Sequence, residues 1–405
     1  MIYLDNAATT RTAPEVVEAM LPYFTEHYGN PSAIYSSGAI GKKAVNEARR
    51  AIAEVIGAKQ EEIHFTAGGT EADNWALKAV AESNIHKGRH IITTKIEHHA
   101  ILHTCKYLEK RGFEVTYLDV DRDGVIDLGQ LETAIRPDTI LISVMFANNE
   151  IGTLEPIGEI GKLAREKGIL LHTDAVQAFG QIPVQVDELG VDLLSASAHK
   201  LNGPKGIGML YVRTGVKLGS FLHGGGQERN RRAGTENVPG IVGFGAAATR
   251  AMGIMEQKAA KERELRDYLI QRIEAEIPYC RLNGHREKRL PGNVNFSFSF
   301  IEGESLLIML DMKGICASSG SACTSGSLDP SHVLLAIGLK HEEAHGSLRM
   351  TLSEENTREE MDFVVEELKQ IVTRLREMSP LYEDFIKSRG HCCAETGTSS
   401  RLRSR

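Results

Sequence analysis

Several features that would assign this 405-residue chain to a special class of protein are missing. It has no excess of positive charge: 47 Lys and Arg residues stand against 54 Asp and Glu residues, so we expect no general attraction to nucleic acid or anionic lipid. We identify no apolar run of the roughly 18 residues that a membrane helix needs, and we expect no membrane span. The opening Met1-Ile2-Tyr3-Leu4-Asp5 is unlike a secretory signal, and no internal repeat is evident.

Cysteines are few and show no disulfide or metal framework. No pair has C-x-x-C spacing among the six, which are Cys105, Cys280, Cys316, Cys323, Cys392 and Cys393. We therefore expect free thiols and a reducing, cytoplasmic setting. His391-Cys392-Cys393 offers too few donors for a metal ion, so we interpret it as incidental, with contact to a partner as the alternative.

What is present is the composition of a folded globular protein, with 41% hydrophobic and 25% charged residues. At about 150 residues per domain, the length predicts two to three domains. Apolar, strand-like runs alternate with helical patterns from about residue 45 to 215, which predicts an α/β fold with a mostly parallel sheet. The expected strands are 62–66, 90–93, 114–118, 139–146, 169–173 and 192–195, and the expected helices include 44–56, 71–81 and 157–167.

A second, smaller α+β unit is expected after a charged helical connector at 257–276. Residues 293–300 and 347–352 have strand patterns, and 358–378 has the pattern of a long amphipathic helix. We predict a large cofactor-binding domain at 11–256, a small domain formed by 1–10 with 257–387, and a disordered tail at 388–405.

Two polar residues follow neighbouring apolar strands, at the edge where ligands of open α/β sheets bind. Asp174 ends the run Ile169-Leu170-Leu171-His172-Thr173, and Lys200 follows Ser195-Ala196-Ser197-Ala198-His199. A helix N-cap explains an isolated Asp, and a solvated loop explains an isolated Lys. Together they form the pair that pyridoxal phosphate requires: a lysine for the Schiff base and a carboxylate for the pyridine nitrogen.

A phosphate site is suggested by Phe65-Thr66-Ala67-Gly68-Gly69-Thr70, a strand, a glycine turn and a helix start. Glycines let backbone N–H groups approach an anion, and a helix N-terminus adds favourable partial charge. A plain capped turn explains this motif equally well when it is taken alone. Its position ahead of Asp174 and Lys200 favours the phosphate site.

These motifs resemble those of class V aminotransferase-fold enzymes, and others narrow the resemblance to cysteine desulfurases of the NifS/IscS type. The resemblance covers residue 1 to about 380. The motifs are Asn6–Thr10, Gly68–Asn74, Asn148–Gly152, His172–Gln177, Ser197–Lys200, Arg232–Asn237 and Ser318–Gly326. The resemblance implies the fold type I of pyridoxal-phosphate-dependent transferases.

The resemblance also implies residue roles. Lys200 is implied as the Schiff-base lysine, Asp174 as the pyridinium partner, Gln177 as a ligand of the phenolic oxygen, and His98 as a ring-stacking residue that assists proton transfer. Arg349 is implied for the substrate carboxylate, a role that suits its planar fork, and Asn149 for both cofactor and substrate. The implied phosphate ligands are Gly69, Thr70, Ser197, His199 and, from a second subunit, Thr235.

Cys323 is the implied sulfur acceptor. It stands among serines and glycines from Ser318 to Ser327, where little could bury it, whereas Cys105, Cys280 and Cys316 fit the pattern of inert buried thiols. The length of this segment resembles the desulfurases that serve iron–sulfur assembly. A metal ion would meet Cys323 only through its persulfide, during cluster transfer.

The function that follows is a homodimeric, cytoplasmic, pyridoxal-phosphate-dependent cysteine desulfurase. It would convert L-cysteine to L-alanine, leave a persulfide on Cys323 and pass the sulfur to an iron–sulfur scaffold protein. A selenocysteine lyase or an aminotransferase on the same fold is the alternative. A non-enzymatic binding protein predicts a broken Lys–Asp pair, and both Lys200 and Asp174 are present.

Overall fold

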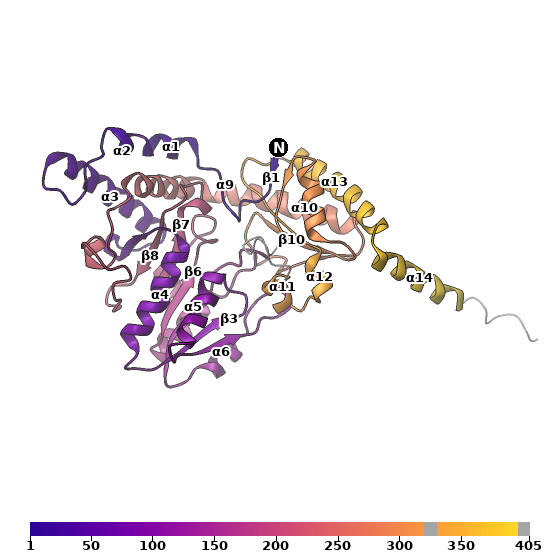
Figure 1. The fold of residues 1–405 in the computed structure, drawn as a ribbon, viewed down its shortest axis with the longest axis horizontal. Coiled ribbons are helices and arrows are strands. Elements are labelled where there is room, and N and C mark those ends of the chain that lie inside the picture. The colour runs from indigo at the N-terminus through magenta and orange to yellow at the C-terminus, as the bar shows by residue number, and fades with distance from the viewer. Residues whose placement is uncertain (320–329, 396–405) are drawn as a thin grey trace, which may run out of the picture.

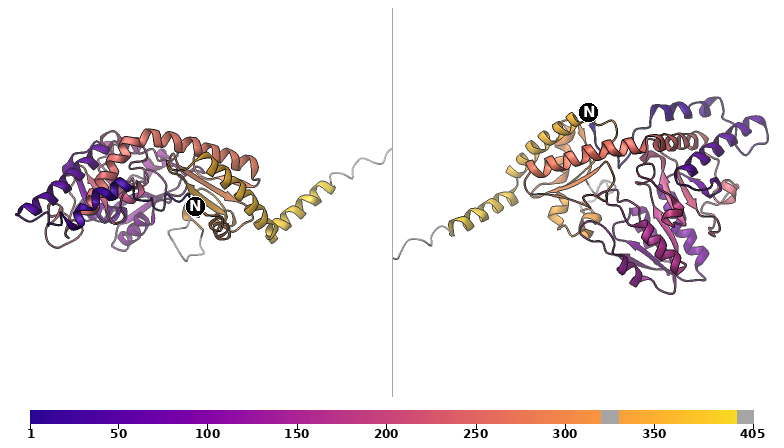
Figure 2. Two further views of the ribbon diagram at one scale, coloured as in Figure 1. Left: turned by 90° about the horizontal axis from the view of Figure 1, so that it is seen from above. Right: turned by 180° about the vertical axis from the view of Figure 1, so that it is seen from behind.

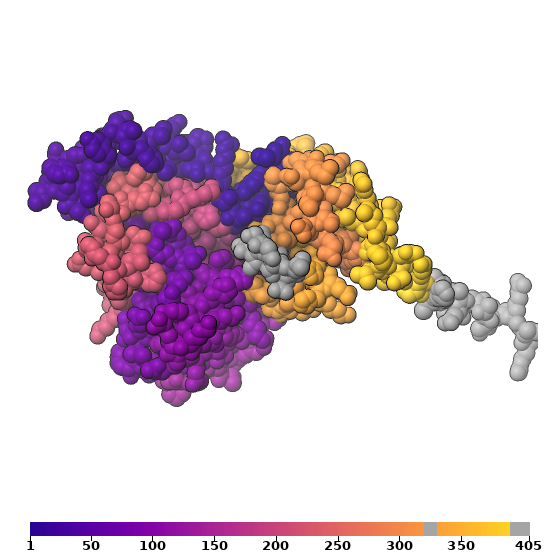
Figure 3. Space-filling model, in the orientation of Figure 1, coloured from indigo at the N-terminus to yellow at the C-terminus, as the bar shows by residue number. Residues whose placement is uncertain are grey.

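The computed structural model describes residues 1–319 and 330–395, and Cys323 therefore lies outside the described residues. These residues form a larger α/β unit and a smaller α+β unit, joined by the long helix α9 (Val238–Glu276) (Figures 1 and 2). The N-terminal segment, indigo in Figure 3, lies at the junction of the two units. There the N-terminal segment meets residues far along the chain: Asn6 and Ala7 donate hydrogen bonds to Thr351.

The larger unit is built on a seven-stranded sheet. Strand β8 is antiparallel to both of its neighbours, and the other neighbouring strands pair in parallel, which confirms the predicted mostly parallel sheet. In sheet order the strands are β2 (Ile63–Thr66), β8 (Gly208–Val212), β7 (Leu193–Ser197), β6 (Leu170–Asp174), β5 (Thr139–Ser143), β3 (His90–Thr94) and β4 (Glu114–Leu118).

Both faces of this sheet are buried, which explains why its strands are continuous apolar runs. Leu193 and Leu210 point into a core with α4 (Gly69–Asn84) and α5 (His99–Glu109). Their neighbours Leu194 and Met209 point into the core on the opposite face. That second core is completed by α3 (Ser36–Val55), α7 (Ile157–Lys167) and the first half of α9.

Helix α9 begins well before the charged connector that the sequence predicts at 257–276. Its first half is rich in small residues and packs closely on α3: a Cβ on Gly245 would lie 2.7 Å from the Cα of Ala48. Within the described residues, α9 is also long and apolar enough to cross a membrane, so the expectation that no such run exists is wrong. Half of the apolar window is buried inside the protein, as in the core helix of a soluble fold.

The smaller unit contains a three-stranded antiparallel sheet and a two-stranded parallel one. Phe296 and Leu348 from the first sheet pack with Leu269 of α9 and with Leu4 near the N-terminus. The first sheet consists of β12 (Ser347–Thr351), β10 (Asn293–Phe298) and β9 (Cys280–Leu282), and the second of β1 (Ile2–Tyr3) and β11 (Ile315–Cys316). Helices α10 (Gly303–Asp311) and α13 (Arg358–Glu377) cover this unit.

The remaining elements are short connecting helices. They are α1 (Pro14–Met20), α2 (Pro22–Thr25), η1 (Gln60–Glu62), α6 (Leu128–Ala134), α8 (Val186–Leu189), η2 (Ala198–Lys200), η3 (Glu228–Asn230), α11 (His332–Ala336) and α12 (His341–His345). Each strand predicted from the sequence is present. The strand at 114–118 has the predicted bounds, and the ends of the others are shifted, most clearly at 139–146, where β5 already stops at Ser143.

The last helix, α14 (Pro380–Glu395), projects away from the smaller unit (Figures 1 and 2). The prediction of a disordered tail from residue 388 is therefore wrong for residues 388–395. Aromatic packing fixes the start of this helix: the ring of Phe385 lies 4.7 Å from that of Phe300 and 5.2 Å from that of Tyr279, centroid to centroid. Once a helix is nucleated, each further residue adds a hydrogen bond at little cost.

Candidate active site

A cavity of about 250 Å³ opens at the carboxyl ends of β6 and β7. Asp174 ends β6, Ser197 ends β7, and Lys200 closes the single turn η2 that follows. All the predicted cofactor and substrate residues except Thr235 line this cavity, and Cys323 lies outside the described residues. Its lining is Ala7, Ala8, Gly69, Thr70, Asp73, His98, Met145, Asn149, Asp174, Val176, Gln177, Ser197, His199, Lys200 and Arg349.

Lys200 is held at both ends. Its Nζ donates hydrogen bonds to the carbonyl oxygens of Ala7 and Ala8, at 2.6 and 2.7 Å. Its own carbonyl oxygen accepts a hydrogen bond from Nε2 of Gln181 at 2.8 Å. Gln177 also donates to the Ala7 carbonyl, at 3.1 Å, so the N-terminal segment forms one wall of the cavity. The ammonium group is thereby held at the cavity while its charge is balanced by carbonyl dipoles.

Asp174 is a buried carboxyl group. Burial raises its pKa to about 6, while the hydrogen bond from the Val176 N–H and the charge of Lys200 oppose this shift. A carboxylate in such a place is stabilised by a cationic N–H partner. The protonated nitrogen of a pyridine ring is such a partner, so the residue fits the role that the resemblance implies.

Asp73 is a cavity residue that the sequence reasoning missed. It lies in the first turns of α4 and is 1% exposed, and its Oδ1 has no hydrogen-bond partner among the residues that the structure describes. Burial and the charge of Asp174 raise its pKa well above the ordinary value. Nε2 of the buried His172 lies 3.7 Å from Asp73 Oδ1 and 3.0 Å from Ser195 Oγ. Asp73 lies within the motif Gly68–Asn74, and this position is the sequence signal that could have identified it as a site residue.

The phosphate end of the cavity lies at the N-terminus of α4. Gly68 has φ +156° and precedes Gly69, whose Cβ, if it had one, would lie 2.6 Å from Cγ2 of Val176. The first N–H groups of a helix have no partner within it. With Ser197 and His199 beside them, these groups provide the donors that a phosphate accepts. Thr235 is exposed and lies outside this cavity.

His98 is the N-cap of α5, and its Nδ1 accepts a hydrogen bond from the Ala100 N–H at 3.1 Å. Burial lowers its pKa, and the charge of Lys200 lowers it further, so the ring is neutral. Because Nδ1 accepts, the ring proton is assigned to Nε2. A neutral imidazole that lines the cavity can both stack on a flat ring and move a proton.

Arg349 lies on β12 and is 2% exposed. Its Nη1 donates to the carbonyl oxygen of Asn149 at 3.0 Å, and its Nη2 pairs with Oδ1 of Asp5 at 2.9 Å. Its Nε has no hydrogen-bond partner within the described residues. A buried guanidinium with an unused N–H beside the cavity fits a carboxylate ligand.

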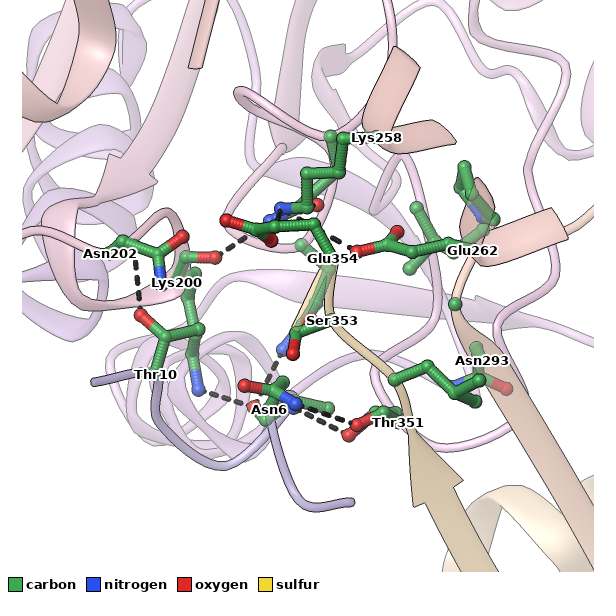
Figure 4. Close-up of a pocket in the computed structure, with 17 residues that line it drawn as sticks. Asn6, Thr10, Lys200, Asn202, Lys258, Glu262, Asn293, Thr351, Ser353 and Glu354 are labelled. Carbon is green, nitrogen blue, oxygen red and sulfur yellow. Dashed lines mark hydrogen bonds and ion pairs between the residues drawn. The ribbon is translucent and has the colours of Figure 1, made fainter. Parts of the chain in front are cut away.

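A second, smaller cavity of about 50 Å³ lies on the other side of Lys200 (Figure 4). Nζ of Lys258, from α9, donates to Oε1 of Gln181 at 2.7 Å, and Gln181 holds the Lys200 carbonyl. Glu262 and Glu354 lie close by, 3.8 and 3.9 Å from the same ammonium group. The sequence reasoning missed this cluster, because residues 257–276 were interpreted only as a charged helical connector.

Cys105, Cys280 and Cys316 are the cysteines whose side chains the structure describes. Cys105 is buried, and burial raises its pKa beyond the range of a reactive thiol; Cys280 has its pKa raised to about 11 for the same reason. Cys316 pairs through its backbone with Tyr3 and is half-buried. Within the described parts of the chain, no group of three or more metal-binding side chains is placed to hold a metal ion.

Comparison with known proteins agrees with this geometry. The sequence profile described as "Aminotransferase class-V" matches residues 2–364. The chain is 58% identical to "Cysteine desulfurase IscS" of Clostridium botulinum over 390 residues, which cover 96% of this chain and 98% of that protein. It is also 58% identical to "Cysteine desulfurase IscS" of Methanosarcina thermophila over 380 residues, 94% of each chain.

Solved structures agree as well. One described as "NifS-like protein" has a TM-score of 0.87 and 40% sequence identity, and the match covers 92% of this chain and 100% of that one. Another, "SspA in complex with cysteine", has a TM-score of 0.77 and 38% identity, and covers 87% of this chain and 99% of that one. The chain belongs to the class-V aminotransferase family and, within it, to the pyridoxal-phosphate-dependent cysteine desulfurases of the NifS/IscS type.

Proposed function

We propose that this chain removes sulfur from L-cysteine, releases L-alanine and carries the sulfur as a persulfide on Cys323. One observation supports this most strongly: Lys200, Asp174, His98 and Arg349 come from four separate segments and line the same cavity. The relatives named cysteine desulfurase match nearly the whole chain. These relatives do not favour the alternative, an aminotransferase or a selenocysteine lyase.

The residues divide the work by position. Asp174, Gln177, Ser197, His199 and the N-terminus of α4 would hold pyridoxal phosphate, which when bound supplies an electron sink for charge at the substrate Cα.

Arg349 and Asn149 would bind the substrate carboxylate at the other end of the cavity. Two groups are placed to take the Cα proton. Lys200 can do so once its Nζ leaves the carbonyl oxygens of Ala7 and Ala8, and the neutral His98 can do so directly.

The sulfur step assigns a separate role to Cys323, which lies outside the described residues. Its thiolate attacks the sulfur of the substrate, so that an S–S bond forms and the C–S bond of the substrate breaks. The electron pair of the broken bond stays with the substrate carbon, which takes up a proton and becomes alanine. Cys323 is oxidised to the persulfide level, and a thiol-bearing acceptor later removes the outer sulfur.

A homodimer is part of the proposal. Exposed apolar side chains gather on α2 and on the segments that join it to α1 and α3: Leu21, Phe24, Tyr28, Ile34 and Tyr35. A second copy of the chain would cover them. Thr235 is exposed on its own subunit, which suits the role of reaching the cofactor phosphate of the partner.

The setting and the acceptor are also proposed. An iron–sulfur scaffold protein in the cytoplasm would take the sulfur, and direct binding to membrane or nucleic acid is not expected from a chain of net charge −7. Unpaired thiols at Cys105, Cys280 and Cys316 are compatible with a reducing compartment.

The test is product analysis with L-cysteine and excess thiol. We expect alanine and sulfide in equal amounts from the enzyme loaded with pyridoxal phosphate. Formation of a keto acid from an amino-acid donor would instead identify an aminotransferase. Turnover of selenocysteine without turnover of cysteine would identify a selenocysteine lyase, and either result would overturn the proposal.

A further inference from the structure

A buried acid joins the substrate-binding part of the cavity to the chain that follows residues 320–329. The carboxylate of Glu150 accepts a hydrogen bond from the hydroxyl of Ser331. Both residues are 4% exposed. Glu150 directly follows Asn149, whose carbonyl oxygen accepts the bond from Arg349. The contact therefore lies one residue from the proposed site of the substrate carboxylate.

The backbone of Glu150 is held firmly. Its N–H donates to Oδ1 of Asn148 at 2.9 Å, and its carbonyl oxygen accepts from Nδ2 of Asn293 at 3.2 Å and of Asn295 at 3.0 Å. Both of these asparagines belong to β10 of the smaller unit. The backbone of Glu150 is thus fixed between the two units. Its carboxylate extends to Ser331, from which it accepts the hydrogen bond.

Ser331 is also the N-cap of α11. Its Oγ accepts from the N–H groups of Val333 and Leu334, at 3.1 and 3.3 Å. The hydroxyl proton is therefore directed to Glu150, and all of the bonding capacity of this side chain is used. Burial raises the pKa of Glu150 to about 7, opposed by the bond from Ser331 and the charge of Arg349, so the acid is ionised in mildly alkaline solution.

The other end of the same segment is fixed beside Arg349. The Ser318 N–H donates to the Arg349 carbonyl at 3.1 Å, and the Arg349 N–H donates to the Ser318 carbonyl at 2.6 Å. The chain on both sides of residues 320–329 is therefore attached next to the substrate-binding residues, and Cys323 lies between these two attachments in the sequence. Holding both ends of a short segment raises the effective concentration of a group that it carries.

We infer that Glu150 is a positioning residue for the sulfur step: by holding Ser331, it fixes one end of the segment that delivers Cys323 to the substrate. This inference rests on the proposed function. Glu150 does not line the cavity and is not a catalytic residue. Its loss should slow the step that needs Cys323 and spare the step that needs only the cofactor cavity.

The test compares two half-reactions at pH 8, using the cofactor-loaded enzyme. The first is exchange of the cysteine Cα hydrogen with solvent deuterium, which does not require Cys323. The second is single-turnover formation of the persulfide on Cys323, followed by mass spectrometry. Glu150→Met keeps the length of the side chain but removes the acceptor of the Ser331 hydroxyl, while Ser331 can still cap α11. We expect persulfide formation to fall roughly 10-fold, the factor for losing one hydrogen bond to a charged group, with Cα exchange unchanged.

Rescue separates this role from simple stabilisation. Glu150→Gln returns an amide oxygen that can accept from the Ser331 hydroxyl. We expect this variant to recover most of the lost rate. Ser331→Thr keeps the hydroxyl and should be close to wild type. The matched control is Glu155→Gln, which alters another buried carboxyl that is also 4% exposed but accepts from the Ile126 N–H instead; it should leave both half-reactions unchanged.

The outcomes are distinct. Equal loss of both half-reactions in Glu150→Met, no loss of either, or a Glu150→Gln variant as slow as Glu150→Met would overturn the inference. If the wild-type enzyme itself forms no persulfide from cysteine, the proposed function fails instead.

Discussion

Gly69→Ala tests the phosphate end of the cavity most sharply, because the structure fixes what the added methyl group meets. Its Cβ would lie 2.6 Å from Cγ2 of Val176 and 3.7 Å from Cβ of Ser197. The first distance is well inside van der Waals contact, so either Val176 or the N-terminus of α4 must move. Overpacking of this kind costs about 1–3 kcal/mol.

The displaced groups line the cavity, so we expect the cost to reduce cofactor affinity. A cost of that size weakens pyridoxal phosphate binding by roughly 5- to 150-fold. The assay is titration of the apoprotein with pyridoxal phosphate, followed by the absorption band of the bound cofactor. The double variant Gly69→Ala/Val176→Ala removes the clash and should bind more tightly than Gly69→Ala alone. Wild-type affinity in Gly69→Ala would refute the assignment of this turn to the phosphate.

Three further predictions follow from the same geometry. Lys200→Ala should remove the absorption band of the covalently bound cofactor and all turnover while the circular dichroism spectrum stays native; turnover near the wild-type rate would contradict its role. Thr235→Ala should weaken cofactor retention in the dimer by about 1–3 kcal/mol, and a dilute monomer that retains cofactor normally would exclude a shared site. Burial raises the pKa of Glu155 to about 8, so its contribution to stability is complete below its ordinary pKa and is lost as pH rises through 8. From pH 5 to pH 9, the unfolding free energy of the wild type should therefore fall by on the order of 2–4 kcal/mol more than that of Glu155→Gln. The same fall in both proteins, measured by denaturant unfolding at each pH, would contradict this.

Local patterns predicted most of the fold because the larger unit repeats one simple arrangement. A strand buried on both faces reads as an apolar run, and a polar residue directly after it lies at the ligand-binding edge, which is how Asp174 and Lys200 could be paired. The start of α9 was missed because its small residues resemble a loop, and only the close approach of Gly245 to Ala48 explains the helix.

The site residues that the sequence did not reveal were missed for a different reason. Asp5 pairs with Arg349, and Glu150 with Ser331, across long stretches of sequence, and no local pattern links such partners. From sequence alone, acidic residues are also expected to be exposed to solvent, because their burial is unknown. Asp73 was visible within a motif, but its burial and its unpartnered oxygen appear only when α4 is packed beside Asp174.

The structure also separates the two kinds of group that the proposed reaction uses. Lys200, His98 and Asp174 are set by packing, by a helix cap and by a strand end, so they are in place before substrate binds. The described chain on either side of residues 320–329 is attached beside this cavity through Ser318 and Ser331. Loss of the acceptor should therefore stop one half-reaction and leave the other intact.

The measurement that tests this account most directly is alanine formation by Cys323→Ser, with Cys316→Ser as the matched control. Serine is a poor nucleophile at neutral pH, whereas cysteine is partly thiolate and intrinsically reactive. We predict that Cys323→Ser retains cofactor binding and Cα hydrogen exchange but forms almost no alanine, and that mass spectrometry of the wild type finds one extra sulfur atom on Cys323. Cys316 is held in the short strand β11, and its replacement should leave turnover largely intact. Normal alanine formation by Cys323→Ser, or an adduct that maps to Cys316, would contradict the account.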